Sequence, residues 1–180
     1  IASDPQFADL RFEATNPSPT HTRTDLLARM AHGRALFEFA HVAPDLPEMA
    51  SWQRKQLAWF QSLLNDARRT HAAPPSLPPV LWALSAGRPE QAMRAYALAP
   101  MVPPWPDGCY EGAPAGTLRL VVIAELPRTR DTLLVRLMGS LKTVRLALEE
   151  LSFFIVIPLC AILSFEAIRN IGARKVDRNG

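Results

Sequence analysis

One short segment constrains the fold of this chain more than any other. Residues 80–85, Val-Leu-Trp-Ala-Leu-Ser, are apolar almost throughout. A strand that is exposed on one face alternates apolar and polar side chains, whereas a strand that is covered on both faces does not. This segment lies between a proline-rich link and Gly87. It therefore predicts a central strand that is buried on both faces of a sheet.

Further elements are predicted on either side of that strand. The patterns indicate strands at 10–15, 24–30, 35–41 and 118–125 and helices at 48–69, 90–97 and 129–148. Residues 44–47 are expected to form a loop. The region 101–116 is also loop-like, with at most a short strand at 109–111. The two long helices each carry one apolar stripe, which is typical of helices that pack on a core. This order predicts an α/β fold with a mixed central sheet flanked by the 48–69 and 129–149 helices.

The segment 24–41 carries the residues that most suggest chemistry. We interpret it as two paired strands joined by a turn at His32-Gly33. Asp25 opens the first strand, and Glu38 lies inside the apolar second strand. Burying a carboxylate without a partner is costly, so Glu38 is either a ligand or part of a solvated edge. Two acids on paired strands are the minimum that holds a divalent metal such as Mg²⁺. A structural role for Asp25 is to bond nearby backbone amides.

Composition narrows the class of protein without deciding it. The 180 residues are 48% apolar and 21% charged, which suits one domain with its own core. The net charge of +3 permits contact with DNA without arguing for it. Cys109 and Cys160 show no metal-ligand spacing and are expected to be free thiols in a reducing cytosol. No glycine-rich phosphate loop occurs, so no small-molecule cofactor is predicted.

The C-terminal region differs from the rest of the chain. Residues 151–165 form a run of 15 uncharged residues, whereas a membrane-spanning helix needs about 20. We expect a buried strand at 153–157 and then a helix to residue 172, and the alternative is a membrane tether through 151–168. We therefore divide the chain into a domain at 1–150 and an apolar segment with a basic tail at 151–180, to which we assign no role.

The ends of the chain and its composition also bear on location. The chain begins at Ile1 rather than at a methionine, so we expect a preceding segment to be missing. No secretory signal is visible, which predicts a cytoplasmic protein for which membrane association is not favoured. The sequence leaves the oligomeric state open.

Two stretches carry a family resemblance. They are LPPVLWALSAGRPEQAMRAY at 77–96 and GCYEGAPAGTLRLVVIAELPRTRDTLLVRLMG at 108–139. Together with the helix that follows, they resemble uncharacterised bacterial proteins related to the PD-(D/E)XK nucleases, near the transposase-like and recombination-promoting nucleases. The resemblance covers roughly residues 10–150, and its most recognisable piece is 125–139. It implies a restriction-endonuclease-like core and a metal-dependent endonuclease-like activity on DNA.

The resemblance also implies roles for individual residues. In that superfamily an aspartate and a glutamate on neighbouring strands bind Mg²⁺, and a lysine two residues after the glutamate assists. Asp25 and Glu38 match the two acids in order and spacing, but Ala40 stands at the lysine position. Some superfamily members supply the missing group from the following helix, where the candidates are Gln53, Lys55 and Gln56. Gln56 lies on the apolar face and is the better one, because Lys55 is expected on the solvent side.

The residue at position 40 keeps an alternative open. With alanine in place of lysine, the chain fits a non-catalytic binding domain on the same nuclease-type fold. The sequence therefore predicts either a metal-dependent hydrolase acting on DNA or a binding domain derived from one.

Overall fold

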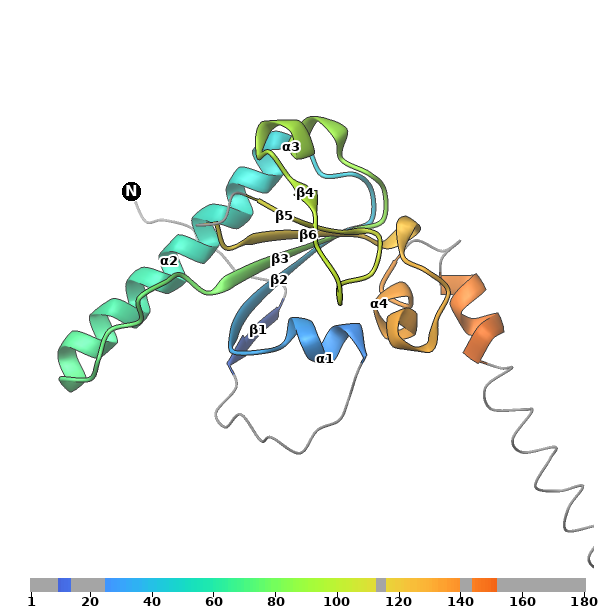
Figure 1. Ribbon diagram of the computed structural model, residues 1–180. Helices are drawn as coiled ribbons and strands as arrows, with labels where there is room; N and C mark the ends of the chain where they lie inside the picture. Colours follow the sequence, from blue (N-terminus) through green and yellow to red (C-terminus); the bar gives the residue numbers. More distant parts are fainter. Residues whose placement is uncertain (1–9, 14–24, 113–115, 140–143, 152–180) are drawn as a thin grey trace, which may run out of the picture.

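The computed structural model describes residues 10–13, 25–112, 116–139 and 144–151 (Figure 1). The strand expected at 153–157 and the helix expected after it lie outside these residues. Within the described ranges, no helix combines the length and the apolar composition that a membrane span needs.

A mixed six-stranded sheet forms the centre of the molecule, in the order β1-β2-β3-β6-β5-β4. Its strands are β1 Leu10–Glu13, β2 Arg34–Ala40, β3 Val80–Ser85, β4 Ala99–Pro100, β5 Cys109–Glu111 and β6 Leu118–Val122. The three central strands β2, β3 and β6 run parallel, and the outer strands pair antiparallel with their neighbours. The predicted α/β class with a mixed sheet is confirmed.

Helices cover both faces of this sheet. They are α1 Leu26–Met30, α2 Leu46–Thr70, α3 Glu90–Ala95 and α4 Leu133–Arg136, with 3₁₀ turns η1 Ile123–Glu125 and η2 Arg130–Thr132 and a further helical stretch at 144–151. The long helix α2 lies across one face together with α3, while α1 and α4 lie on the other side of the sheet (Figure 1). Two hydrophobic clusters result, one on each face.

The central strand β3 contributes to both clusters. Leu81 and Ala83 face α2, whereas Trp82 and Leu84 face α1, and none of the four side chains is exposed to solvent. This double burial confirms the prediction made from residues 80–85. The strands β2 and β5 also lie where the pattern placed them, with both ends of β2 one residue earlier than predicted.

The segment 24–30 differs from the prediction, because it is helical rather than extended. Leu26 and Met30 are four residues apart and both are buried, as one face of a helix requires. Asp25 is the N-cap, and its Oδ1 accepts a hydrogen bond from the backbone N–H of Ala28 at 2.8 Å. The predicted pairing of 24–30 with 35–41 is therefore wrong, since the neighbours of β2 are β1 and β3.

Other boundaries differ for local reasons. The helix expected over 129–148 is interrupted, because α4 ends at Arg136 and a turn reaches Gly139 before residues 144–151 become helical again. Gly139, a poor helix former, is the last described residue of that turn region. The helix α2 begins inside the expected 44–47 loop, since Asp45 caps it by accepting from the N–H of Glu48 at 2.8 Å.

The turn that leads into β5 requires glycine at position 108. Gly108 has φ 86°, and a Cβ at this position would lie 3.0 Å from the carbonyl oxygen of Val122. We expect Gly108→Ala to lower the free energy of unfolding by about 2 kcal/mol or more, because backbone strain and steric overlap add. Urea denaturation monitored by circular dichroism measures this change.

Gly33 offers the matched control for that substitution. Its φ is 75°, but a Cβ there would have nothing within 4 Å. Gly33→Ala should therefore cost about 1 kcal/mol, the conformational part alone. Equal costs at the two positions would contradict the steric account of Gly108.

Candidate functional site

Glu38 and Lys55 form an ion pair between the sheet and α2. Glu38 is on the face of β2 that packs against α2, because side chains alternate along the strand and its neighbours Leu36 and Ala40 belong to the cluster on that face. The Nζ of Lys55 donates a hydrogen bond to Oε2 of Glu38 at 2.8 Å. The side chain of Glu38 is 1% exposed and that of Lys55 is 16% exposed. The glutamate thus acquires the countercharge that its burial requires.

The position of Lys55 corrects the prediction that this residue lies on the solvent side of its helix. Lys55 is next to Gln56, which is buried, so it sits at the border of the packed face. A lysine at such a border runs its aliphatic chain along apolar surface and directs its ammonium group to a nearby acid.

Gln56 connects α2 to the loops that lead into two strands. Its Nε2 donates to the carbonyl oxygen of Pro79 at 2.6 Å and to Oγ1 of Thr117 at 2.6 Å. Pro79 directly precedes β3, and Thr117 directly precedes β6. Through these contacts Gln56 holds the N-terminal ends of β3 and β6 against α2, which is a structural role.

Asp25 lies on the other side of the sheet from Glu38. It caps α1, whose residues Leu26 and Met30 belong to the cluster opposite α2. A Mg²⁺ ion needs several oxygen ligands around one point. The structure therefore does not bring Asp25 and Glu38 together as one metal site, and no group of three or more potential ligands occurs among the described residues.

A polar cluster at the carboxyl end of β3 was not foreseen. Arg88 donates from Nη1 to the hydroxyl of Tyr110 at 2.6 Å and to Oε1 of Glu125 at 2.8 Å. The Tyr110 hydroxyl in turn donates to Oε2 of Glu125. Burial, followed by the bond to Glu125, raises the pKa of Tyr110. The three side chains tie the loop after β3 to η1, and their wide separation in sequence left no local signal.

An arginine–tryptophan cluster lies on the opposite face. The guanidinium of Arg119 is 5.1 Å from the ring centre of Trp82 and 5.7 Å from that of Trp105. Arg29 lies 5.3 Å from the Trp105 ring and donates to the carbonyl oxygen of Pro104 at 2.6 Å. These contacts hold the 101–108 loop against the sheet. Trp82 is fully buried, while Trp105 is half-buried.

Two further residues, Glu13 and Cys109, have structural environments. Glu13 is exposed and accepts from Nε of Arg34 at 2.6 Å across the β1–β2 pair. Cys109 is buried, and burial raises the pKa of its thiol to about 12, so this cysteine is a core residue and not a nucleophile.

Comparison with known proteins adds no family to this picture. No family model matches the chain, and neither a curated protein nor a solved structure matches it. Fold and side-chain geometry together define the class, an α/β domain with a mixed six-stranded sheet and a buried acid–lysine pair under its long helix.

Proposed function

We propose that this chain is a non-catalytic DNA-binding domain on a restriction-endonuclease-like scaffold. The observation that carries the proposal is the Glu38–Lys55 pair. Glu38 is the acid that the family resemblance assigns to metal binding, yet its carboxylate is 1% exposed and accepts from Lys55 at 2.8 Å. In this proposal the former ligand has become part of the core.

The energetics of the pair oppose metal binding at Glu38. A Mg²⁺ ion would compete with Lys55 for the carboxylate, and displacing Lys55 would leave a partly buried ammonium group without its countercharge. Breaking a buried pair in this way costs about 3–5 kcal/mol. The second acid of the expected site, Asp25, lies across the sheet and contributes nothing to repay that cost.

The placement of exposed cations, rather than the net charge, supports DNA as the partner. The chain has a net charge of +3. The exposed side of α2 carries Arg54, Arg68 and Arg69, of which Arg69 also contacts Asp66 at 3.0 Å. Exposed cations of this kind bind the phosphate backbone without reading sequence, and such binding weakens as the salt concentration rises.

A second candidate function is favoured by the same ion pair. The resemblance implies that the following helix can supply the missing lysine, and Lys55 on α2 contacts Glu38. In that alternative Glu38 binds Mg²⁺ and Lys55 orients the attacking water, as in a working nuclease.

Titration and binding assays separate the two candidates. We expect fluorescence anisotropy to show that the chain binds a short DNA duplex and that the binding weakens with salt. Calorimetry should show the same Mg²⁺ and Mn²⁺ binding, if any, for the native chain and for Glu38→Gln. Gel assays should show no cleavage of the duplex. Asp25→Asn should leave all three results unchanged, since this residue caps a helix on the other face. Metal binding and cleavage that Glu38→Gln abolishes would overturn the non-catalytic proposal and support the nuclease.

A further inference from the structure

Arg136, the last residue of α4, is buried although arginine is seldom buried without a partner. Its partner is Glu150. Nη1 of Arg136 donates to Oε1 of Glu150 at 2.8 Å, and Nη2 donates to Oε2. The arginine side chain is 5% exposed and that of the glutamate 23%. The contact is therefore a bidentate ion pair in which the arginine is buried and the glutamate is partly exposed to solvent.

The helical stretch 144–151 that carries Glu150 is less buried than the elements of the core. Ala147 is its one buried residue, whereas Leu148 and Glu149 are exposed. A segment with so little buried apolar surface opens at low cost compared with the core elements. The ion pair to Arg136 attaches residues 144–151 to α4.

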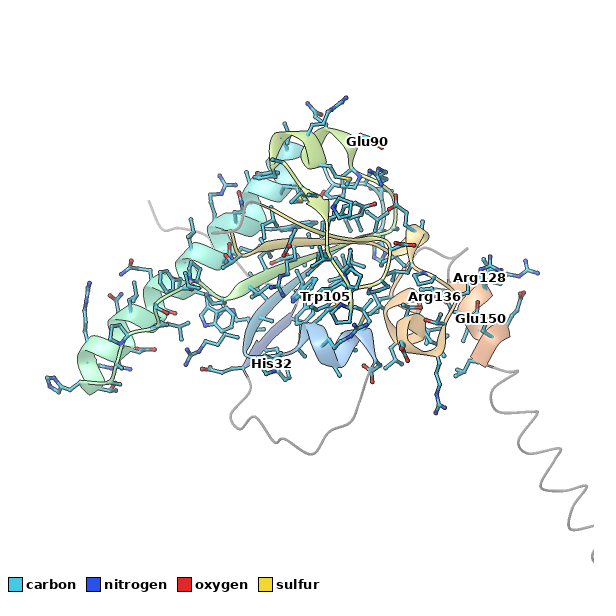
Figure 2. All side chains as sticks on the ribbon, viewed as in Figure 1. His32, Glu90, Trp105, Arg128, Arg136 and Glu150 are labelled. Atoms are coloured by element: carbon cyan, nitrogen blue, oxygen red, sulfur yellow. The ribbon has the colours of Figure 1, made fainter. Side chains whose placement is uncertain are left out.

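The surroundings of Arg136 favour an anion larger than a carboxylate. Its Nε is buried and has no hydrogen-bond partner among the described residues. Arg128 is exposed and near, and Figure 2 shows Arg128, Arg136 and Glu150 beside one another. The hydrogen bonds from Arg136, with a smaller contribution from the charge of Arg128, hold the pKa of Glu150 below its usual value. A guanidinium fork flanked by a second arginine matches the oxygens of a phosphate.

We propose that Arg136 and Arg128 form a binding site for a backbone phosphate of DNA, and that Glu150 occupies this site from within the chain. The residues 144–151 then act as an internal competitor that lowers affinity for DNA until the helical stretch is displaced. This inference rests on the proposed DNA-binding function. It adds a phosphate contact at α4, on the other side of the sheet from the arginines of α2, and a regulatory contact.

Two neighbouring acids on the same helical stretch provide a matched test. Glu150→Gln and Glu149→Gln change the net charge equally, but Glu149 is exposed and forms an ion pair with Arg145 of the same helical stretch at 3.3 Å. We expect Glu150→Gln to tighten binding of a labelled duplex about tenfold, the effect of one charge-assisted hydrogen bond. Glu149→Gln should change the affinity by less than about twofold, as surface charges usually do. Equal effects of the two substitutions would overturn the proposal.

A further variant and a second readout complete the experiment. Arg128→Gln in the Glu150→Gln chain should remove the gain, and because Arg128 is exposed this substitution does not threaten folding. Hydrogen exchange should show faster exchange at 144–151 in Glu150→Gln than in Glu149→Gln. If inorganic phosphate at matched ionic strength releases the duplex as well as competitor DNA does, the site is one for free phosphate and the assignment to DNA fails.

The outcomes distinguish failure of this inference from failure of the proposed function. If the native chain and both single variants bind no duplex, the DNA-binding function is wrong. If the native chain binds duplex and Glu150→Gln binds it no more tightly than Glu149→Gln, the function stands and the internal competition is wrong.

Discussion

Replacing Lys55 with methionine is expected to destabilise this protein by about 3–5 kcal/mol. The substitution keeps most of the apolar chain that lies along α2 but removes the ammonium group that contacts Glu38 at 2.8 Å. The carboxylate, 1% exposed, then stays buried without that countercharge. Urea denaturation monitored by far-ultraviolet circular dichroism gives the change in the free energy of unfolding.

Two further variants make this prediction specific. Glu38→Leu/Lys55→Met replaces both charges with apolar groups and should recover stability to within about 1 kcal/mol of the native chain. Arg54→Met alters the exposed cation next to Lys55 and should change stability by no more than about 0.5 kcal/mol. If Lys55→Met instead has no effect on stability or increases it, the result favours the nuclease. Catalytic residues are often retained although they lower stability.

The second large effect is expected at the centre of the sheet. Trp82 is 0% exposed, and its ring lies 5.3 Å from that of Trp105. Its Nε1 donates to the carbonyl oxygen of Met30 at 3.0 Å, which joins β3 to the end of α1. Trp82→Ala should cost about 3–5 kcal/mol, since it leaves a large cavity and an unsatisfied carbonyl group. Thermal and urea denaturation both report this loss.

Comparison with other substitutions separates packing from hydrogen bonding at this position. Trp82→Phe retains an aromatic ring but loses the donor, so it should cost clearly less than Trp82→Ala. Trp105→Ala, at a half-buried position, should also cost less. A cost at Trp105 equal to that at Trp82 would mean that the 101–108 loop, rather than the central strand, dominates this face.

The elements that were predicted correctly are those whose length and pattern together exclude the alternative. Residues 80–85 are an apolar run that is too short for a helix and lies between a proline-rich link and Gly87, and α2 has an apolar stripe long enough to exclude a strand. The segment 24–30 is too short for such a decision. Its apolar positions fit an alternating strand and a helix equally well, and Asp25 supplies the cap that selects the helix.

Part of the candidate site could also be predicted from local sequence patterns. Glu38 stands out in sequence because an acid inside an apolar strand needs a partner, and Lys55 is among the candidates on the following helix. The order of preference between Lys55 and Gln56 could not be decided from helical spacing. That spacing places Gln56 on the buried face but does not show that its amide bonds to Pro79 and Thr117.

By itself the sequence determined the class of fold and the need for a group to neutralise Glu38, because hydrophobic periodicity and the cost of burying charge are local properties. Only the tertiary structure decided that Lys55 is that group, that Asp25 lies across the sheet, and that Arg136 meets Glu150. These contacts depend on the order of the strands and on which face each helix covers. Sheet order and helix placement arise from packing between distant segments, which no local pattern encodes.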